Sequence, residues 1–414
     1  MTAPRALSYP EALSRVLAAA EARPATRVPL RDAVGRALRE TVHASHALPA
    51  FRNSAMDGFA VRSTDVAAAT PDAPRVLRVR AVLPAGATHA DAHALAAGEA
   101  ARIMTGAMLP PGADAVIAFE EATRMGEGAD ERVEVRQPAP VGQHVREAGA
   151  DLAAGALALA PGTRLDARNL ALLTALGLTS VHVGARPRVA ILSTGDELLE
   201  PGAPLRDGAV RDSNGLMLAQ LVEEAGGEAT ILPRLPDDPA RVEAGLRAAL
   251  ASHDVVLTIG GVSAGDFDPV KQAIAHLTGF ELWRVAMRPG RPQAFGALDG
   301  RLFFGLPGNP ASVVCVFEAL VRPALLAWQG FAAVERARIP VRCAVAIASR
   351  ESRTDFVRCR LAWHEGRAMA TPEGAQVSGH LTPQAWAHAL LIVPESVAAF
   401  AAGDAAEAIV WSLP

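Results

Sequence analysis

The stretch that decides the fold is VVLTIGGVSAGDFDPVK, residues 255–271. Its first five residues form an unbroken apolar and β-branched run, which is typical of a strand buried on both faces of a parallel sheet. Glycines and acidic residues follow directly, and Pro269 begins a segment with helical periodicity. The stretch therefore predicts one strand, loop and helix unit of an α/β domain, with a polar loop at the carboxyl end of the strand.

The same pattern recurs on both sides of this stretch. Further buried strands are expected at residues 189–192, 229–232 and 302–304, and helices at 214–225, 239–251, 269–277 and 310–328. Asp212 or Ser213 is a candidate N-cap, and prolines begin the other three helices. This alternation predicts right-handed crossovers and a doubly wound, mostly parallel sheet with helices on both faces.

The flanking regions have a different texture. Residues 9–39 and 165–177 show helical periodicity, whereas glycines, prolines and short alternating runs such as 76–80 and 132–136 predict a β-rich region. Further strands are expected at 339–347, 358–363, 390–393 and 408–411, as a small barrel or sandwich. Length and texture predict three or more domains, and the texture changes at these bounds: a mainly helical linking region (1–48 with 144–185), an inserted β-rich region (49–143), the α/β region (186–330) and a C-terminal β-region (331–414).

The composition excludes several classes of protein. A chain of 414 residues with 50% hydrophobic residues is too long for one small module and too apolar for global disorder. The near balance of 40 basic and 44 acidic residues argues against a nucleic-acid binder with a broad basic face. Residues 1–15 lack a central apolar run, and no stretch of about 18 apolar residues occurs, so we expect neither export nor a membrane span.

The three cysteines, Cys315, Cys343 and Cys359, have neither the spacing of a zinc site nor the even count of a disulfide framework. A reducing compartment fits best, and we expect a cytoplasmic protein.

Polar residues gather where ligands bind in an open parallel sheet, beyond the carboxyl ends of the strands. The loops 193–197, 260–268 and 305–312 follow three of the predicted strands and are rich in glycine, with Gly261 and Ser263 in the second. Glycines allow close approach of the backbone, and helix N-termini attract anions. The sequence therefore predicts a phosphate or oxyanion site at this edge of the sheet.

The same loops carry four carboxylates, at Asp196, Glu197, Asp266 and Asp268. Carboxylates beside a phosphate would repel it unless a cation intervenes, and Mg²⁺ is the ion that joins such oxygen ligands. Any one of the three aspartates taken alone is equally well explained as a helix N-cap. Neither a Walker A sequence nor G-x-G-x-x-G is present, which disfavours a P-loop NTPase and a dinucleotide-dependent dehydrogenase.

Arg288 and Arg291 flank a Pro-Gly turn, and two guanidinium groups so spaced suit a tetrahedral oxyanion. Alone, this segment would be interpreted as a solvated basic turn. Considered separately, three other segments are likewise predicted to be ordinary turns (54–59 and 102–107) and a charged loop (146–151).

Taken together, these segments resemble the molybdopterin molybdenumtransferase family, the MoeA-type enzymes and the C-terminal half of gephyrin. The resemblance rests on seven collinear motifs: PAFRNSAMDGFA (49–60), RIMTGAMLPPGADAV (102–116), VREAGADLAAG (145–155), STGDEL (193–198), GGVSAGDFDPVK (260–271), MRPGRPQAFG (287–296) and GLPGNPAS (305–312). The tail is similar more weakly, through residues 353–358 and 376–380.

The resemblance implies the last step of molybdenum cofactor synthesis, in which molybdate enters the dithiolene of adenylylated molybdopterin, AMP leaves and Mg²⁺ is required. It also implies a molybdopterin-binding α/β domain, a C-terminal β-barrel and an elongated homodimer with its site between protomers. A molybdopterin adenylyltransferase and molybdoenzyme-maturation proteins would be partners, and neither nucleic acid nor a membrane would be.

The site residues that the resemblance implies fall into three groups. Metal ligands would be Glu197 and Asp268, which would also handle the pyrophosphate link, with Asp266 beside them. Asp57, Thr105 and Asp151 would be contributed across the dimer. The tetrahedral oxyanion, molybdate or tungstate, would be held by Arg288, Arg291, Ser312, Arg358 and Ser378.

This chain departs from the family at 288 and 291, where lysine is usual. Arginine serves as an electrostatic clamp but not as a proton shuttle. Lys271 is the only lysine, so either a role near the substrate phosphate or a helix-face salt bridge is open. Two other functions are open as well: a sugar-kinase-like phosphotransferase, suggested by Gly265-Asp266 after a strand, and a scaffold that has kept the fold without turnover.

Overall fold

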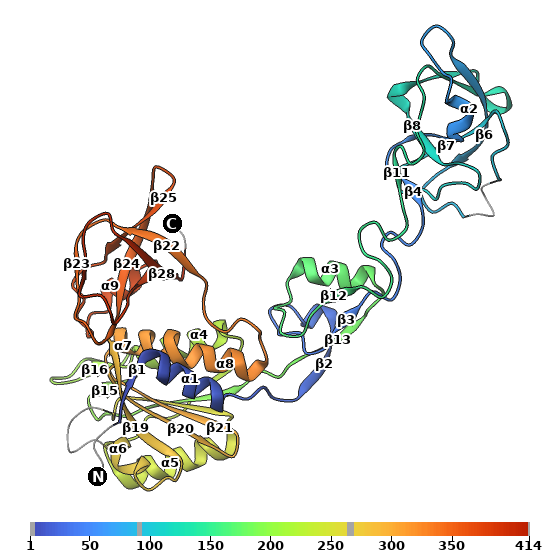
Figure 1. The fold of residues 1–414 in the computed structure, drawn as a ribbon. Coiled ribbons are helices and arrows are strands. Elements are labelled where there is room, and N and C mark those ends of the chain that lie inside the picture. The colour runs from blue at the N-terminus through green and yellow to red at the C-terminus, as the bar shows by residue number, and fades with distance from the viewer. Residues whose placement is uncertain (1–4, 89–92, 263–268, 413–414) are drawn as a thin grey trace. The chain divides into compact units, whose positions relative to one another are not determined.

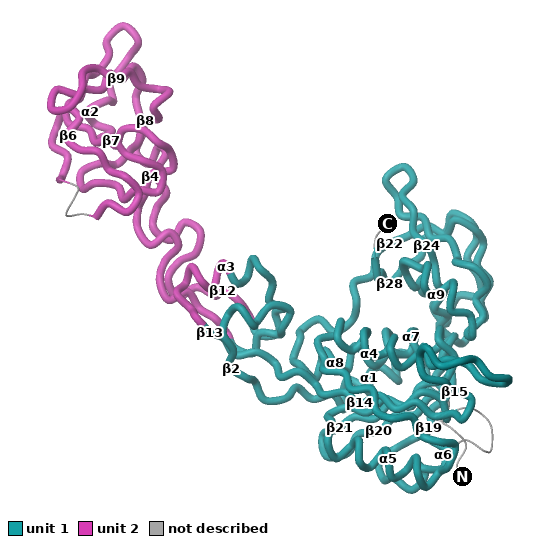
Figure 2. The backbone as a smooth tube through the Cα atoms, turned by 180° about the vertical axis from the view of Figure 1, so that it is seen from behind, with its two compact units in different colours: residues 1–40, 161–170, 180–414 teal, residues 41–160, 171–179 magenta. Residues whose placement is uncertain are grey.

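The structure is a computed structural model that describes residues 5–88, 93–262 and 269–412 (Figure 1). The chain forms two compact units, coloured separately in Figure 2. The first comprises Met1–Glu40, Pro161–Leu170 and Ser180–Pro414, and the second comprises Thr41–Ala160 and Ala171–Thr179.

The α/β sheet of the first unit has the predicted parallel centre. Its strands β17 (Glu228–Ile231), β14 (Arg188–Ser193), β18 (Val255–Ile259) and β21 (Arg301–Leu306) lie side by side in parallel. The antiparallel hairpin of β20 (Pro292–Leu298) and β19 (Phe280–Arg288) continues the sheet, and β1 (Arg5–Ser8) pairs in parallel with β19. A short parallel pair, β15 (Leu198–Leu199) and β16 (Val210–Arg211), stands apart from it.

Helices cover both faces of this sheet, as predicted (Figure 1). One face carries α1 (Tyr9–Ala19), α4 (Asn214–Glu224), α7 (Pro310–Val316), the π-turn η4 (Phe317–Val321) and α8 (Arg322–Gln329), and the other carries α5 (Pro239–Ser252) and α6 (Pro269–Ile274). Successive β14 side chains alternate between the two cores: Val189 and Ile191 pack on the first face and Ala190 and Leu192 on the second. The unbroken apolar run in the sequence therefore reflects burial on both sides.

The N-terminal segment differs from the prediction of a helical stretch over residues 9–39. The helix ends at Ala19, residues Ala25–Pro29 form strand β2, and Leu30–Asp32 form a single 3-10 turn, η1. Prolines bracket the strand at 24 and 29 and cannot donate helical hydrogen bonds. The segment 29–38, whose apolar spacing suggested a second helix, forms η1, turns and the isolated bridges of Ala37 and Leu38. Strand β2 pairs with β13 (Ser180–Gly184).

The first twenty residues also lie in the α/β core, although the sequence analysis placed them in a separate linking domain. Tyr9, Leu13 and Val16 are buried in the same cluster as the sheet residues. The Ser8 hydroxyl caps α1 by accepting the Glu11 N–H at 3.2 Å. The remaining linking region is built from short strand pairs and a single helix, α3 (Ala167–Ala175), rather than being mainly helical.

The second unit is mostly β-structure. A six-stranded sheet has the order β8 (Ala115–Ala118), β5 (Gly58–Val61), β7 (Glu99–Ile103), β6 (Arg75–Leu83), β10 (Arg132–Val135) and β9 (Ala122–Met125). The unit also contains α2 (Ser63–Val66), the turns η2 (Phe119–Glu121) and η3 (Gly128–Asp130), and the pairs β4 (Asn53–Ser54) with β11 (Val145–Arg146) and β3 (Val42–His43) with β12 (Leu157–Leu159). The strands expected at 76–80 and 132–136 are present.

The C-terminal region forms a closed five-stranded barrel, as expected. It consists of β22 (Arg338–Cys343), β24 (Thr354–His364), β25 (Arg367–Pro372), β26 (Ala389–Val393) and β28 (Ala405–Val410), with β23 (Ile347–Ala348), β27 (Ala399–Phe400) and the short helix α9 (Thr382–Trp386) beside it. The first residues of β24 pair with the end of β19, Met287 opposite Thr354 and Arg288 opposite Asp355. The barrel is therefore hydrogen-bonded to the edge of the α/β sheet.

Within the described part of the chain, the helical segment Pro310–Gln329 is long and apolar enough to cross a membrane. The protein itself buries 89% of its most apolar window, so the segment serves as a core helix.

Candidate active site

The loop after β14 places Glu197 at the carboxyl edge of the sheet. Gly195 has φ +134°, a conformation that residues with a side chain rarely adopt, and a methyl group there would lie 2.5 Å from Glu197 Oε2. The Glu197 carboxylate thus folds back over Gly195 while remaining exposed. Arg234 Nη1 donates to the Gly195 carbonyl (2.6 Å) and Arg206 Nη2 to the Asp196 carbonyl (2.7 Å), which fixes the loop.

Backbone hydrogen bonds join the three predicted ligand loops. The Thr194 N–H donates to the Ile259 carbonyl at 3.2 Å, and the Gly260 N–H donates to the Leu306 carbonyl at 2.9 Å. Asn214 Nδ2, at the start of α4, donates to the Gly308 carbonyl at 2.8 Å. The loops after β14, β18 and β21 therefore meet at one edge of the sheet, as the sequence predicted.

The N-terminus of α4 adds two residues to this edge that sequence reasoning did not assign to the site. Asp212 Oδ2 accepts the Ser193 hydroxyl at 2.5 Å, while Oδ1 accepts the Asn214 and Gly215 N–H groups, both at 3.0 Å. The Asp212 carboxylate therefore accepts the first N–H groups of α4, whereas Ser213, at the N-cap position, makes no side-chain capping bond. Asn214 is only 8% exposed, and its Oδ1 has no hydrogen-bond partner among the described residues. The Asp-Ser-Asn triplet before an apolar helix was the available signal.

The N-terminus of α7 brings together the two serines expected to hold the oxyanion. Ser312 lies buried in the first helical turn. The Ala311 N–H donates to the Ser378 carbonyl at 3.1 Å, and Asn309 Nδ2 donates to Ser378 Oγ at 3.0 Å. A loop of the barrel and the start of a helix in the α/β domain therefore form one polar surface. Its two serines, Ser312 and Ser378, are 66 positions apart in the sequence.

Arg358, another predicted oxyanion ligand, is 1% exposed, and its guanidinium is engaged by the protein. Nη1 donates to the His380 carbonyl at 3.1 Å, and Nη2 donates to the carbonyls of Ala375 and Val377 at 3.2 and 3.0 Å. Its backbone N–H donates to Gln376 Oε1 at 3.0 Å. Burial lowers the pKa of this guanidinium, yet arginine remains protonated at neutral pH. These contacts hold the 375–380 loop, which carries Ser378.

The two arginines of the Pro-Gly turn border two different cavities. Arg288 Nη1 lies 3.7 Å from Asp355 Oδ2 and borders a cavity of about 210 Å³ that Arg358 also lines. Arg291 borders another cavity, of about 780 Å³, together with Arg284. The turn therefore directs the two side chains to different surroundings, and the two-guanidinium fork stays a prediction.

Asp355 partly neutralises the positive charge of Arg288. It is 3% exposed, and Arg353 Nε lies 2.7 Å from its Oδ1. Sequence reasoning did not assign this carboxylate to the site, because only the pairing of β24 with β19 places it opposite Arg288.

In the second unit, two of the three predicted residues are in contact. Thr105 donates to Asp57 Oδ1 through both its backbone N–H (2.6 Å) and its hydroxyl (2.7 Å). These two bonds lower the pKa of the Asp57 carboxyl below its usual range, so the group is ionised at neutral pH. Asp151 is exposed and held through its N–H, which donates to the Leu48 carbonyl at 3.0 Å.

Ser263, Asp266 and Asp268 lie outside the described residues. Gly261 has φ +71°, and Lys271 lies in α6. Among residues 5–88, 93–262 and 269–412, no group of three or more His, Cys, Asp or Glu side chains is arranged to hold a metal ion. Burial raises the pKa of the Cys315 thiol to about 12, so this cysteine is protonated.

Comparison with known proteins assigns nearly all of the chain to domains of known families. Residues 7–177 match the MoeA N-terminal region (domains I and II), residues 190–327 match a probable molybdopterin-binding domain, and residues 340–411 match the MoeA C-terminal region (domain IV). The chain belongs to the molybdopterin molybdenumtransferase family. It is accordingly a transferase of molybdenum cofactor biosynthesis.

Relatives that match this chain over most of their length support the assignment to the family. The chain is 40% identical to molybdopterin molybdenumtransferase 2 of Mycobacterium tuberculosis, covering 94% of this chain and 95% of the relative. It is 34% identical to the molybdopterin molybdenumtransferase of Bacillus subtilis, covering 91% and 87%. A crystal structure of a molybdopterin biosynthesis moeA protein from Pyrococcus horikoshii superimposes with a TM-score of 0.80 at 32% identity, over 99% of this chain and all of the other.

Proposed function

We propose that this chain inserts molybdate into adenylylated molybdopterin, releases AMP and requires Mg²⁺. The observation that carries the proposal is the meeting of Ser312, Ser378 and Asn309 at the start of α7, next to the joined loops after β14, β18 and β21. Family membership supplies the reaction class. We further propose that the enzyme works as a cytoplasmic homodimer with its site between protomers.

The oxyanion would be held mainly by neutral donors. Helix N-termini favour anions because their first N–H groups and the helix dipole point toward the ligand. The Ser312 and Ser378 hydroxyls and the Asn309 amide can reorient to donate to the oxygens of a tetrahedral dianion. Arg288, half exposed beside Asp355, would add positive charge from the end of β19.

The donor set suits Mg²⁺ bound partly by substrate. Mg²⁺ usually takes one or two protein carboxylates, with waters and substrate phosphates completing its coordination. Glu197 presents an exposed carboxylate at the sheet edge, and Asp268 and Asp266 would join it from outside the described residues. When bound, the ion would neutralise charge on the phosphoanhydride.

The second unit would complete the site across the dimer. Asp57, Thr105 and Asp151 would be contributed by the partner protomer, a proposal that rests on the family. Because Asp57 is ionised at neutral pH, it would accept hydrogen bonds rather than donate a proton. The residues of this chain therefore bind, orient and neutralise, so that positioning and electrostatics supply most of the acceleration.

The test is to incubate purified protein with adenylylated molybdopterin, Mg²⁺ and molybdate and to measure AMP. Glu197→Gln is expected to abolish AMP release with an unchanged thermal midpoint. Glu200→Gln, a nearby exposed carboxylate, is the matched control and should retain full activity. Full turnover by Glu197→Gln would remove Glu197 from the mechanism.

The same experiment separates the other two functions. A sugar-kinase-like phosphotransferase would consume ATP without molybdate. A scaffold would bind the pterin and release no AMP under any condition, and that outcome would overturn the proposed activity.

A further inference from the structure

Asn214 connects the start of helix α4 to the loop that follows β21. It is the first residue of α4 and is only 8% exposed. Its Nδ2 donates to the Gly308 carbonyl at 2.8 Å, although the two residues are 94 positions apart in the sequence. Gly308 lies in an exposed part of its loop. The bond therefore fixes a surface loop of the candidate site against a buried helix start.

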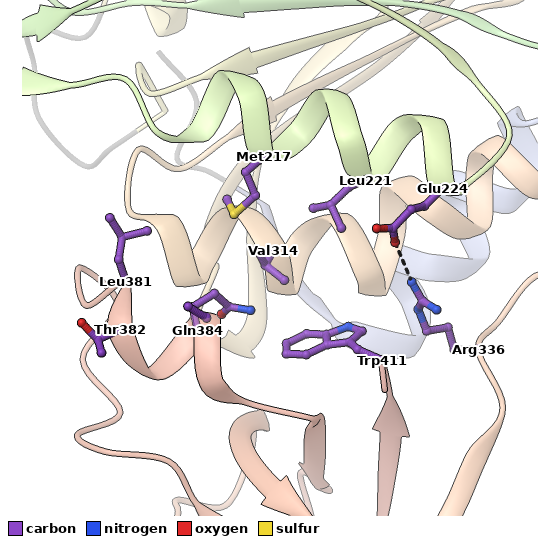
Figure 3. A pocket seen from close by; sticks show the side chains of 10 residues that line it. Met217, Leu221, Glu224, Val314, Arg336, Leu381, Thr382, Gln384 and Trp411 are labelled. Carbon is purple, nitrogen blue, oxygen red and sulfur yellow. Dashed lines mark ion pairs between the residues drawn. The ribbon is translucent and has the colours of Figure 1, made fainter. Parts of the chain in front are cut away.

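Helix packing alone does not orient this loop. Helices α4 and α7 lie side by side, with Met217 of α4 next to Val314 of α7 (Figure 3). Apolar contacts of this kind are non-directional, so they hold the two helices together without setting the direction of a peptide group before α7. A hydrogen bond has a preferred angle as well as a preferred length. The Asn214 amide therefore supplies an orientation that the apolar packing lacks.

Only one half of the Asn214 amide has a partner. The buried Oδ1 has none among the residues that the structure describes. Reversing the amide would place Oδ1 against the Gly308 carbonyl, so the hydrogen-bond network decides which way the amide points. A buried acceptor without a partner lowers stability, and an apolar side chain with the same branching would avoid this loss. Asparagine at position 214 is therefore explained by its bond to Gly308 rather than by the stability of the core.

The bond to Gly308 acts on the polar surface at the start of α7. The Gly308 carbonyl and the Asn309 N–H belong to the same planar peptide group. Asn309 Nδ2 donates to Ser378 Oγ at 3.0 Å, and the Ala311 N–H donates to the Ser378 carbonyl at 3.1 Å. Rotation of this peptide group would therefore change where the Asn309 amide points relative to Ser378.

The residue pair before Asn214 joins the same helix start to the loop that carries Glu197. Asp212 Oδ2 accepts the Ser193 hydroxyl at the end of β14 at 2.5 Å, and Oδ1 accepts the Asn214 N–H at 3.0 Å. The Asp212 N–H donates to the Leu199 carbonyl at 2.9 Å. The start of α4 is therefore bonded to both sides of the candidate site, through Asp212 on one side and through the Asn214 amide on the other.

We propose that Asn214 is a positioning residue for the transfer of molybdenum. It acts through Gly308 and Asn309, and it holds the oxyanion side of the site at a fixed distance from the side that carries Glu197. The inference rests on the proposed function, because it assumes that both sides serve one reaction. The Asn214 side chain is buried and acts without touching the substrates. Its contribution is geometric, and a displacement of about 1 Å in a positioning group can lower a rate about 10²-fold.

The test is AMP release by the full-length protein at varied molybdate concentrations. Asn214→Leu keeps the number of side-chain heavy atoms and removes the donor, so the KM for molybdate should rise about 5- to 10-fold. The KM for adenylylated molybdopterin should stay at the wild-type value, because the Asp212 contacts that hold the Glu197 loop remain. Asn214→Ala, which cannot overfill the buried position, should give the same result.

Gln329→Leu is the matched control. Gln329 is 1% exposed, and its Nε2 donates to the Ala225 carbonyl at 2.8 Å, directly after the last residue of α4. The variant thus removes a buried bond from an amide side chain to a carbonyl at the opposite end of the same helix. Its KM for molybdate should equal the wild-type value even where its thermal midpoint falls.

Amide hydrogen exchange gives a second readout that does not depend on turnover. Exchange of the Ala311 amide, which donates to the Ser378 carbonyl, should become faster in Asn214→Leu and stay at the wild-type rate in Gln329→Leu.

Two results would overturn the proposal. The first is a wild-type KM for molybdate in both Asn214→Leu and Asn214→Ala. The second is an equal rise of this KM in Gln329→Leu, which would assign the effect to the stability of α4. If the wild type releases no AMP, the proposed function fails, and the exchange of the Ala311 amide alone then decides whether Asn214 holds the loop.

Discussion

Replacing Arg358 by Met tests whether its guanidinium serves the protein or the oxyanion. Methionine has similar length and apolar character but donates no hydrogen bond. The change removes three bonds to the carbonyls of Ala375, Val377 and His380. Hydrogen bonds from a charged donor each contribute roughly 1.5–3 kcal/mol, so even the low end of that range gives a loss of about 4.5 kcal/mol for the three bonds.

Amide hydrogen exchange over residues 375–380 measures this loss locally, which suits a multidomain chain that need not unfold in one step. Arg360→Met is the matched control on the same strand. Arg360 is half exposed and pairs with Glu373, so its loss should cost no more than about 1 kcal/mol. Protection of the loop should fall in Arg358→Met and persist in Arg360→Met.

The refuting result is specific. If Arg358→Met leaves exchange over 375–380 unchanged but raises the KM for molybdate more than tenfold, the guanidinium contacts the oxyanion directly, as family resemblance implies. If both loop protection and molybdate use decline together, Arg358 is a positioning residue that acts through the loop carrying Ser378.

Three other perturbations have defined outcomes. Thr105→Val should raise the pKa of Asp57 toward its ordinary value of about 3.9, and carboxyl NMR would follow this change. Because the pKa of Asp57 is lower in the folded protein than in the unfolded chain, the Asp57–Thr105 contact stabilises the fold at neutral pH, and this stabilisation is lost as the pH falls through the folded pKa. Gly195→Ala should displace the Glu197 carboxylate and lower AMP release at least about tenfold with the fold intact, as activity and circular dichroism would show; wild-type activity would contradict the geometry. Mixing inactive Asp57→Asn and Glu197→Gln subunits should restore about a quarter of wild-type activity if the site lies between protomers, and none if it lies within one.

The α/β domain was predictable because burial on both faces leaves a plain trace in the sequence. The run 255–259 contains no charged residue and only one polar one, Thr258, and the loop after it carries the charged residues. The meeting of the loops at Thr194, Gly260 and Gly308 follows from parallel strands ending at the same edge. The topology of the sheet is therefore sufficient to predict at which edge the candidate site lies.

Other features depended on pairing between distant segments, which no local pattern encodes. The apolar spacing over residues 29–38 fitted a helix, yet Ala37 and Leu38 instead form bridges with Arg164 and Val183, which are distant in the sequence. Arg288 and Arg291 looked like a pair because they are three residues apart, yet the turn sends them to different cavities. Asn214 is notable only because its Oδ1 is buried beside the ligand loops, which depends on the packing of α4.

The barrel shows why a functional contribution can be hard to recognise in a sequence. Ser378 reaches the start of α7 because Arg358 holds the loop and because β24 pairs with β19. Arg358 binds backbone carbonyls, which every residue possesses, so the contacts place little constraint on the side chains of residues 375–377. A loop of this kind can keep its geometry while its sequence changes, so its contribution to the candidate site is hard to recognise from a short motif, although residues 340–411 as a whole match the family's C-terminal region.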